Sequence, residues 1–141
     1  MKYKLIITLA GSLWAIAWTQ MVSADTLHIV ITNVSSSDGT VMVQVLNSQA
    51  QFEGEGQVAA FAEQAVSGEM RFQAANLPPG EYAFRVMHDE NNNGKLDSNF
   101  VGMPKEPWAF SNNAMGNFGP AKWQDAKFTL AGETTQTIQL N

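Results

Sequence analysis

The feature that most constrains the fold of this chain is a period of two in its apolar residues, repeated in short segments that turn-forming residues separate. Apolar residues occupy every second position over 27–31 and again over 41–45, and a cluster of Ser, Asp and Gly lies between the two segments. Alternation that uses β-branched residues is typical of strands with one buried face. We therefore expect a strand in each segment and a turn between them.

The same signals recur toward the C-terminus. Residues 81–88 alternate after the turn sequence Leu-Pro-Pro-Gly at 77–80, and the pattern returns over 123–130 and 135–140. Strands about ten residues apart, with turn residues between them and almost no helical periodicity, predict an all-β fold. We expect an antiparallel Greek-key β-sandwich of about seven strands, with one long ordered loop excursion.

One segment, residues 58–66, fits either a helix or a strand. Its apolar residues match one face of a helix, whereas the Ser-Gly pair at 67–68 and the alternation over 70–74 that follow it match a strand. We expect a hairpin in this region, because a turn signal directly precedes the alternating segment.

Residues 1–24 have the pattern of a secretory signal peptide. Lys2 and Lys4 precede a largely apolar run, and the small residues Val-Ser-Ala end it at Ala24. A membrane-spanning helix needs about 20 apolar residues, and this run is shorter. We therefore expect cleavage after Ala24, a single domain over 25–141, a periplasmic or secreted location, and no stable membrane insertion after cleavage.

Composition excludes several classes of function. The chain has no cysteine, so disulfides, thiol catalysis and thiolate zinc sites are ruled out. Setting aside Lys2 and Lys4 of the leader leaves 6 of the 8 basic residues against 13 acidic ones, a net charge of −7. This charge argues against nucleic acid and anionic membrane surfaces as partners.

A calcium-loop pattern follows the strand predicted over 81–88. Oxygen-bearing side chains stand at the first, third, fifth and ninth positions of 89–97, and glycine stands at the sixth. In the first half of a calcium loop this spacing turns alternate side chains inward, and the glycine permits a sharp reversal that aims the seventh carbonyl at the ion. The expected ligands are Asp89, Asn91, Asn93, the carbonyl of Lys95 and Asp97.

The twelfth position of this loop is Phe100, where an EF-hand carries a bidentate glutamate. The missing ligand would come from elsewhere, and Glu106 is the first candidate, with Glu90 second. Oxygen ligands favour calcium over zinc or copper, and two formal charges predict a Kd of about 10⁻⁴ to 10⁻³ M. The alternative is a tight turn at Asn93-Gly94 with no ion.

Beyond the loop, an extended segment rich in proline carries Trp108 and Phe110, followed by Asn112 and Asn113. The two aromatic residues could form an exposed platform for a sugar, with the asparagines as hydrogen-bond partners. A carbohydrate- or cell-envelope-binding module without metal is therefore our alternative function. For a small domain we instead expect these aromatic side chains to hold the segment on the core.

Catalytic patterns are weak in this chain. His28 and His88 are its histidines, and no Ser/His/Asp spacing or nucleophile elbow accompanies them. Ser111 lies among asparagines, and the carboxylates near Glu106 are already assigned to the ion. We expect a protein that is not an enzyme, with a small hydrolase using His88 or Glu106 as the lesser alternative.

Three segments carry a family resemblance: LPPGEYA at 77–83, HDENNNGKLD at 88–97 and GMPKEPWAFSNN at 102–113. In this order, and with a matching closing stretch over 120–130, they resemble the bacterial secreted family catalogued as domain of unknown function 2141 (DUF2141). The resemblance implies an exported single domain with a transthyretin-like (prealbumin-like) or adhesin-like sandwich. Such sandwiches usually bind with their loops and edges, so an unknown protein or glycan is the expected partner.

Overall fold

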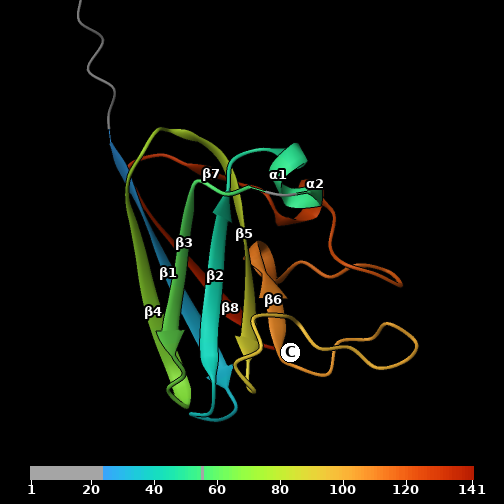
Figure 1. The fold of residues 1–141 in the computed structure, drawn as a ribbon. Coiled ribbons are helices and arrows are strands. Elements are labelled where there is room, and N and C mark those ends of the chain that lie inside the picture. The colour runs from blue at the N-terminus through green and yellow to red at the C-terminus, as the bar shows by residue number, and fades with distance from the viewer. Residues whose placement is uncertain (1–23, 55) are drawn as a thin grey trace, which may run out of the picture.

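Eight strands form the framework of the described chain, which comprises residues 24–54 and 56–141 of the computed structural model (Figure 1). In chain order the elements are β1 (Asp25–Val34), β2 (Thr40–Leu46), α1 (Gln49–Glu53), β3 (Ala59–Gln64), β4 (Gly68–Leu77), β5 (Gly80–Asp89), β6 (Trp108–Phe110), the 3-10 helix η1 (Ser111–Asn113), α2 (Trp123–Ala126), β7 (Phe128–Leu130) and β8 (Glu133–Gln139). The predicted all-β class is confirmed. The predicted leader lies outside the described residues except for its last position, Ala24.

The strands form two sheets that face each other. One sheet has the order β4-β1-β8, and the other has the order β3-β2-β5-β6, with β7 also paired to β5. The expectation of a wholly antiparallel sandwich is wrong for one pair, because β1 and β8 run parallel. A parallel pair cannot be joined by a tight turn, and here its two strands come from opposite ends of the domain.

The hairpin expected around 58–74 is also wrong, although both of its strands exist. β3 pairs with β2 in one sheet, whereas β4 pairs with β1 in the other. The connection at 65–67 therefore carries the chain from one sheet to the other. The strands expected over 123–130 are likewise only partly right, since 123–126 form helix α2 and only 128–130 form a strand.

The core lies between the two sheets and is built from alternate residues of the strands. Phe84 is its largest fully buried side chain, and its ring meets Phe128 edge-on at a centroid distance of 6.1 Å. The buried side chains of the two inner faces include Leu27, Ile29, Ile31, Val41, Val43, Val45, Met70, Phe72, Tyr82, Phe84, Val86, Ile138 and Leu140. Burial of this set explains why a domain without disulfides can fold.

Tyr82 fixes the turn into β5. Its hydroxyl donates a hydrogen bond to the Pro78 carbonyl at 2.8 Å, a contact of the tyrosine-corner type. Burial of the phenol, together with the negative charge of Asp25, raises the pKa of Tyr82 above its ordinary value of 10.0. The stabilisation by the neutral phenol is thus fully present below pH 10.0 and is lost as the pH rises through the folded-state pKa.

A second, smaller apolar cluster joins α1 and α2 to one end of β5. It contains Leu46, Phe52, Ala83, Ala114, Ala121, Trp123 and Ala126. Ser111 is buried beside it, where its hydroxyl accepts a hydrogen bond from the Phe84 amide at 3.0 Å and donates to the Ala126 carbonyl at 2.7 Å. These bonds fix η1, and therefore the end of β6, against the second sheet.

Candidate functional site

The predicted calcium loop begins where β5 ends, at a buried carboxylate. Asp89 is 2% exposed, and its Oδ1 accepts the Asn93 amide at 3.1 Å while its Oδ2 accepts the Gly94 amide at 2.7 Å. The turn between β1 and β2 packs against the start of this loop, where Gly39 lies against the Asp89 carbonyl. Asp89 therefore folds the following residues back over the end of its own strand.

The asparagines continue this curl. Asn91 Oδ1 accepts the Asn93 amide at 3.1 Å, and Asn93 Oδ1 accepts the Lys95 amide at 2.9 Å. Their carboxamide nitrogens both donate to Asp97, from Asn91 at 2.7 Å and from Asn93 at 3.0 Å. The structure thus brings Asp89, Asn91, Asn93 and Asp97 together in one loop.

Glu106 closes this loop from the segment that follows it. The side chain is 7% exposed; its Oε1 accepts the Glu90 amide at 3.0 Å and its Oε2 accepts the Asp97 amide at 2.9 Å. A buried carboxylate that binds two main-chain N–H groups is a strong staple, since each bond is charge-assisted. The two residues predicted as remote ligands, Glu90 and Glu106, are therefore linked to each other through this contact.

The carboxylates alone do not form a metal cluster. Across residues 24–54 and 56–141, no three His, Asp or Glu side chains come together in an arrangement that could hold a metal ion. An ion in this loop would therefore need amide and main-chain oxygens in addition to Asp89 and Asp97, as the sequence pattern predicts. The roles of the six predicted ligands, including the Lys95 carbonyl, stay predictions.

The two carboxamide hydrogen bonds from Asn93 and Asn91 lower the pKa of Asp97 below its ordinary value of 3.8, with help from the positive charges of Lys105 and Lys95. Because the folded-state pKa is the lower one, this stabilisation is present above pH 3.8 and is lost as the pH falls through the folded-state pKa. We expect carboxyl NMR to show Asp97 titrating below pH 3.8. Replacing both asparagines by alanine should raise the Asp97 pKa toward that value, and an unchanged pKa in this variant would contradict the assignment.

The residues considered for catalysis lie inside the protein. His88 is fully buried; its Nε2 hydrogen-bonds with the Asp38 carbonyl at 2.7 Å, and its Nδ1 lies 3.9 Å from a Glu90 carboxylate oxygen. Ser111 is also fully buried and is held by the bonds to Phe84 and Ala126. A substrate on the surface would contact neither side chain.

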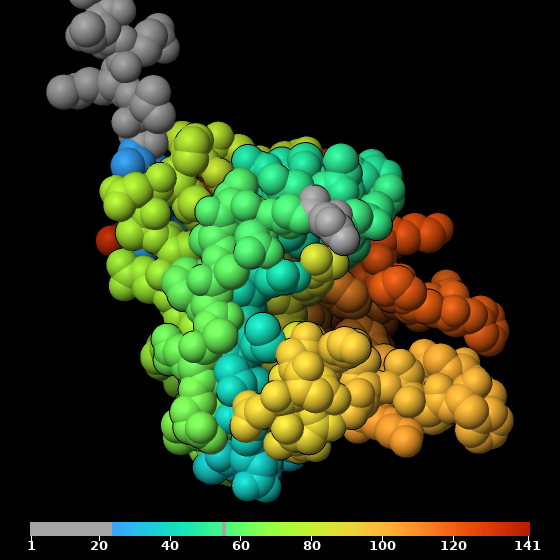
Figure 2. Space-filling model, viewed as in Figure 1, coloured from blue at the N-terminus to red at the C-terminus, as the bar shows by residue number. Residues whose placement is uncertain are grey.

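A groove of about 1260 Å³ runs over the outer face of the five-stranded sheet. Its floor is made by outward-facing residues of β2, β3 and β5, and the loop segments 94–104 and 115–121 stand on either side. Figure 2 shows these segments projecting from one side of the molecule as two arms, orange and orange-red, with a hollow between them. This groove was not predicted from the sequence. The signal for it was methionine at outward strand positions, since Met42 and Met87 are cross-strand partners.

The two arms expose large apolar side chains. Phe100 and Phe118 are fully exposed, and Val101, Met103 and Met115 are each more than half exposed. Phe118 also has a φ of 68°, a left-handed conformation that L-residues with bulky side chains seldom adopt. Exposed apolar groups gathered at one side of a domain typically mark an interaction surface.

Trp108 and Phe110 lie between these arms on β6. Their rings meet edge-on at 5.4 Å, and Phe110 also contacts Phe52 at 5.4 Å. Both are half-buried, which agrees with the packing role expected for them. The asparagines expected beside a bound sugar instead bond the main chain, Asn112 to the 125–127 carbonyls and Asn113 to β8. Sugar binding stays a prediction.

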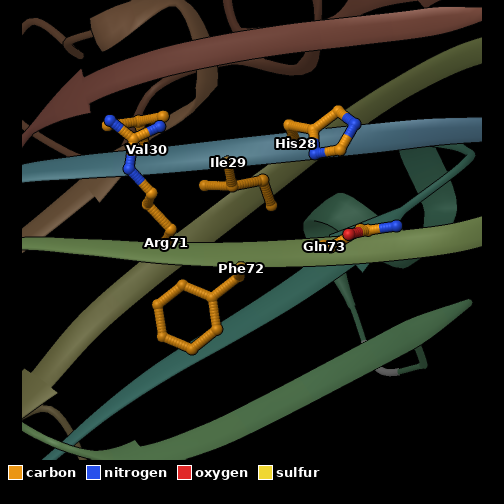
Figure 3. Close-up of a pocket in the computed structure, with 6 residues that line it drawn as sticks. All are labelled: His28, Ile29, Val30, Arg71, Phe72 and Gln73. Atoms are coloured by element: carbon orange, nitrogen blue, oxygen red, sulfur yellow. The ribbon is translucent and has the colours of Figure 1, made fainter.

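A second hollow, of about 250 Å³, lies on the three-stranded sheet between β1 and β4. Figure 3 shows His28 and Arg71 on the outer side of the strands, whereas the ring of Phe72 points to the opposite side, into the core. Arg71 is paired with Glu69 at 2.7 Å. This shallow surface brings together no set of groups that suggests chemistry.

No helix among the described residues has the length and apolar character that crossing a bilayer requires.

Comparison with the curated proteins and with the solved structures finds no match for this chain. A family model does match, over residues 29–139, which cover nearly the whole sandwich from β1 to β8. The predicted family is thereby confirmed: the chain belongs to the bacterial family described as "Uncharacterized protein conserved in bacteria (DUF2141)".

Proposed function

We propose that this protein is an exported, non-catalytic binding domain in which calcium orders the loop 89–97 and, through it, one side of the apolar groove. The observation that carries the proposal is the convergence of the loop side chains on Asp97, whose two carboxylate oxygens each accept a carboxamide N–H, from Asn91 and Asn93. A divalent cation at this centre would replace two weak donors by a full counter-charge. Export is supported by the leader pattern of residues 1–24.

The chemistry of the loop suits a hard cation. Rotation of either carboxamide about its terminal bond exchanges nitrogen for oxygen, so Asn91 and Asn93 can turn an acceptor toward the ion, in exchange for the bonds that their Oδ1 atoms accept from the Asn93 and Lys95 amides. Asp89 and Asp97 would supply the charge and the Lys95 carbonyl a neutral oxygen. With only two formal charges, the expected Kd is about 10⁻⁴ to 10⁻³ M, within the range of extracellular calcium modules.

The loop is coupled to the groove through residues 97–104. The Lys105 amide donates a hydrogen bond to the Asp97 carbonyl at 2.7 Å, and Ser98 forms an isolated antiparallel β-bridge with Pro104. Inside this hairpin, Asn99 Oδ1 accepts the amides of Val101 and Met103, both at 3.0 Å. Fixing Asp97 therefore fixes the base of the arm that carries Val101 and Met103 beside the groove.

A transthyretin-like Greek-key arrangement belongs to the same proposal. Its support is that β1 lies between β4 and β8 in one sheet while β2 lies between β3 and β5 in the other. In such sandwiches the loops at the ends of the strands present the binding surface, which is where the arms stand here.

Isothermal titration of the domain 25–141 is expected to detect calcium binding that Asp89→Ala abolishes. Because Asp89 also caps the Asn93 and Gly94 amides, Asp97→Asn provides a second variant that retains the shape of its side chain. The matched control is Asp125→Asn, an exposed position on α2 that should bind as the wild type does.

The same titration can contradict the proposal. A flat titration at millimolar calcium, with the domain folded by circular dichroism, would exclude an ion in this loop. Thermal melting gives an independent check, because calcium at tenfold its Kd should raise the free energy of unfolding by about 1.4 kcal/mol.

A further inference from the structure

We propose that the groove binds a single-chain amphiphile with an anionic head group, namely a long-chain fatty acid, with its carboxylate at Arg85 and its chain along the floor of the groove. This inference names the ligand class of the proposed binding surface and rests on that function. Three observations support it: a cation in the floor that forms no ion pair with the described residues, the apolar character of the surrounding wall, and the size of the groove.

Arg85 lies on β5, and its Nε donates a hydrogen bond to Gln44 Oε1. Gln44 is held in turn, since its Nε2 donates to Gln57 Oε1 at 2.8 Å. No carboxylate of the described chain forms an ion pair with this guanidinium. Its terminal N–H groups are therefore available for an incoming acid, and guanidinium binds a carboxylate with two parallel hydrogen bonds.

Charge complementarity selects an anionic head group. Among the described residues that line the groove, Arg85 and Glu53 are the charged ones, and Glu53 accepts a hydrogen bond from Gln49 on its own helix. An arginine without an ion pair to any described residue, in an apolar surface, favours one negative group there, because the other polar side chains described in the lining, apart from Glu53, are neutral.

The floor beside Arg85 suits a flexible alkyl chain. Met42 and Met87 are cross-strand partners, and Trp108 is the partner of Met87 on the other side. All three line the groove. Methionine adapts its shape to an apolar ligand better than branched residues do. The volume of about 1260 Å³ exceeds the roughly 300–1,000 Å³ of common small-molecule pockets, which leaves room for a long chain.

Quenching of Trp108 by dibrominated stearate tests this directly. The domain 25–141 contains two tryptophans, Trp108 in the groove and Trp123, which is buried and does not line it. Brominated stearate below its micelle concentration is expected to quench the fluorescence, and Trp108→Phe should remove most of that quenching, since Trp123 lies behind Phe52, a lining residue. Arg85→Gln should raise the Kd for brominated stearate by about tenfold or more. The affinity for the uncharged oleyl alcohol, measured by competition, should be the same in the variant and the wild type.

The matched control is Arg71→Gln, which removes an exposed arginine from the outer face of the other sheet and should leave the Kd unchanged. Ala60→Glu, on the exposed groove floor beside Gln44, should block binding by repelling the carboxylate, whereas Ala75→Glu on β4 should not. Equal loss in both members of either pair would overturn the proposal, because it would show a general effect on the fold.

Other occupants give distinct results that also overturn it. Quenching only by vesicles of brominated phosphatidylcholine would assign the exposed arms to a bilayer surface. A dimer in light scattering that Ala60→Glu dissociates, with no quenching by stearate, would assign the groove to a second copy. Absence of any quenching would exclude an alkyl chain beside Trp108.

Stearate quenching is measured in chelator, because millimolar calcium precipitates the fatty acid, and calcium is titrated in its absence; the two results separate the two proposals. Quenching in chelator together with a flat calcium titration would retain the ligand class and reject the calcium role. Calcium binding in the titration, without stearate quenching in chelator, would retain the calcium role and reject the ligand class.

Discussion

Replacing Gly39 by alanine is expected to lower the free energy of unfolding by about 2–4 kcal/mol. Gly39 has a φ of 70°, and an added Cβ would lie 1.9 Å from the Asp89 carbonyl oxygen and 2.6 Å from the Glu90 Cα. These are main-chain atoms, so the collision cannot be relieved by rotating a side chain. Urea denaturation with an unchanged m-value would measure the loss.

Gly132→Ala is the matched control for this prediction. Gly132 has a nearly equal φ of 68°, but an added Cβ would meet nothing within 4 Å. Its loss should be limited to the conformational term, about 1–2 kcal/mol. Equal losses in the two variants would show that the β1–β2 turn does not press on the start of the loop. Because the collision falls on Asp89, Gly39→Ala should also weaken calcium binding, whereas Gly132→Ala should not.

Phe84→Ala is expected to lower the free energy of unfolding by about 3–5 kcal/mol. The ring is fully buried between the sheets, contacts Phe128 edge-on, and belongs to the strand that leads into the loop. Removing it leaves a cavity that the two sheets cannot close without shifting β5. Calorimetry and urea denaturation should agree on the loss if unfolding is two-state.

The control for Phe84 is Phe100→Ala, since Phe100 is fully exposed at the tip of its arm. It should change the free energy of unfolding by no more than about 0.5 kcal/mol. A loss below about 1 kcal/mol for Phe84→Ala, or a comparable loss for both variants, would contradict the packing of the two sheets around this ring.

The strands were predictable because each is encoded by its own residues. Alternation over 27–31, 41–45 and 81–88 appears in the structure as β1, β2 and β5, with the alternate residues buried. Pairing was not predictable in the same way. The strands at 59–64 and 68–77 are neighbours in sequence yet belong to different sheets, because pairing depends on which faces are covered and on no local signal.

The candidate site likewise has a part that was predictable from local sequence and a part that depends on the fold. The spacing of Asp89, Asn91 and Asn93 with Gly94 is a local pattern, and its curl depends on hydrogen bonds no more than a few residues apart. Glu106 was named from sequence as a remote residue, but its contacts with the Glu90 and Asp97 amides come only from the folded chain. The proposed calcium titration tests replacement of the carboxamide donors around Asp97 by an ion.

By itself, the order of residues determined the β class, the family, the turn positions and the inward curl of the acidic loop, since all of these depend on neighbours along the chain. Only the tertiary structure decided the parallel pairing of β1 with β8, the burial of His88 and the groove around Arg85. The physical reason is that burial and pairing depend on distant segments. From the sequence, Met42 and Met87 are predicted only to lie on the outer face of a strand. They become part of the groove because loops from elsewhere in the chain lie beside them.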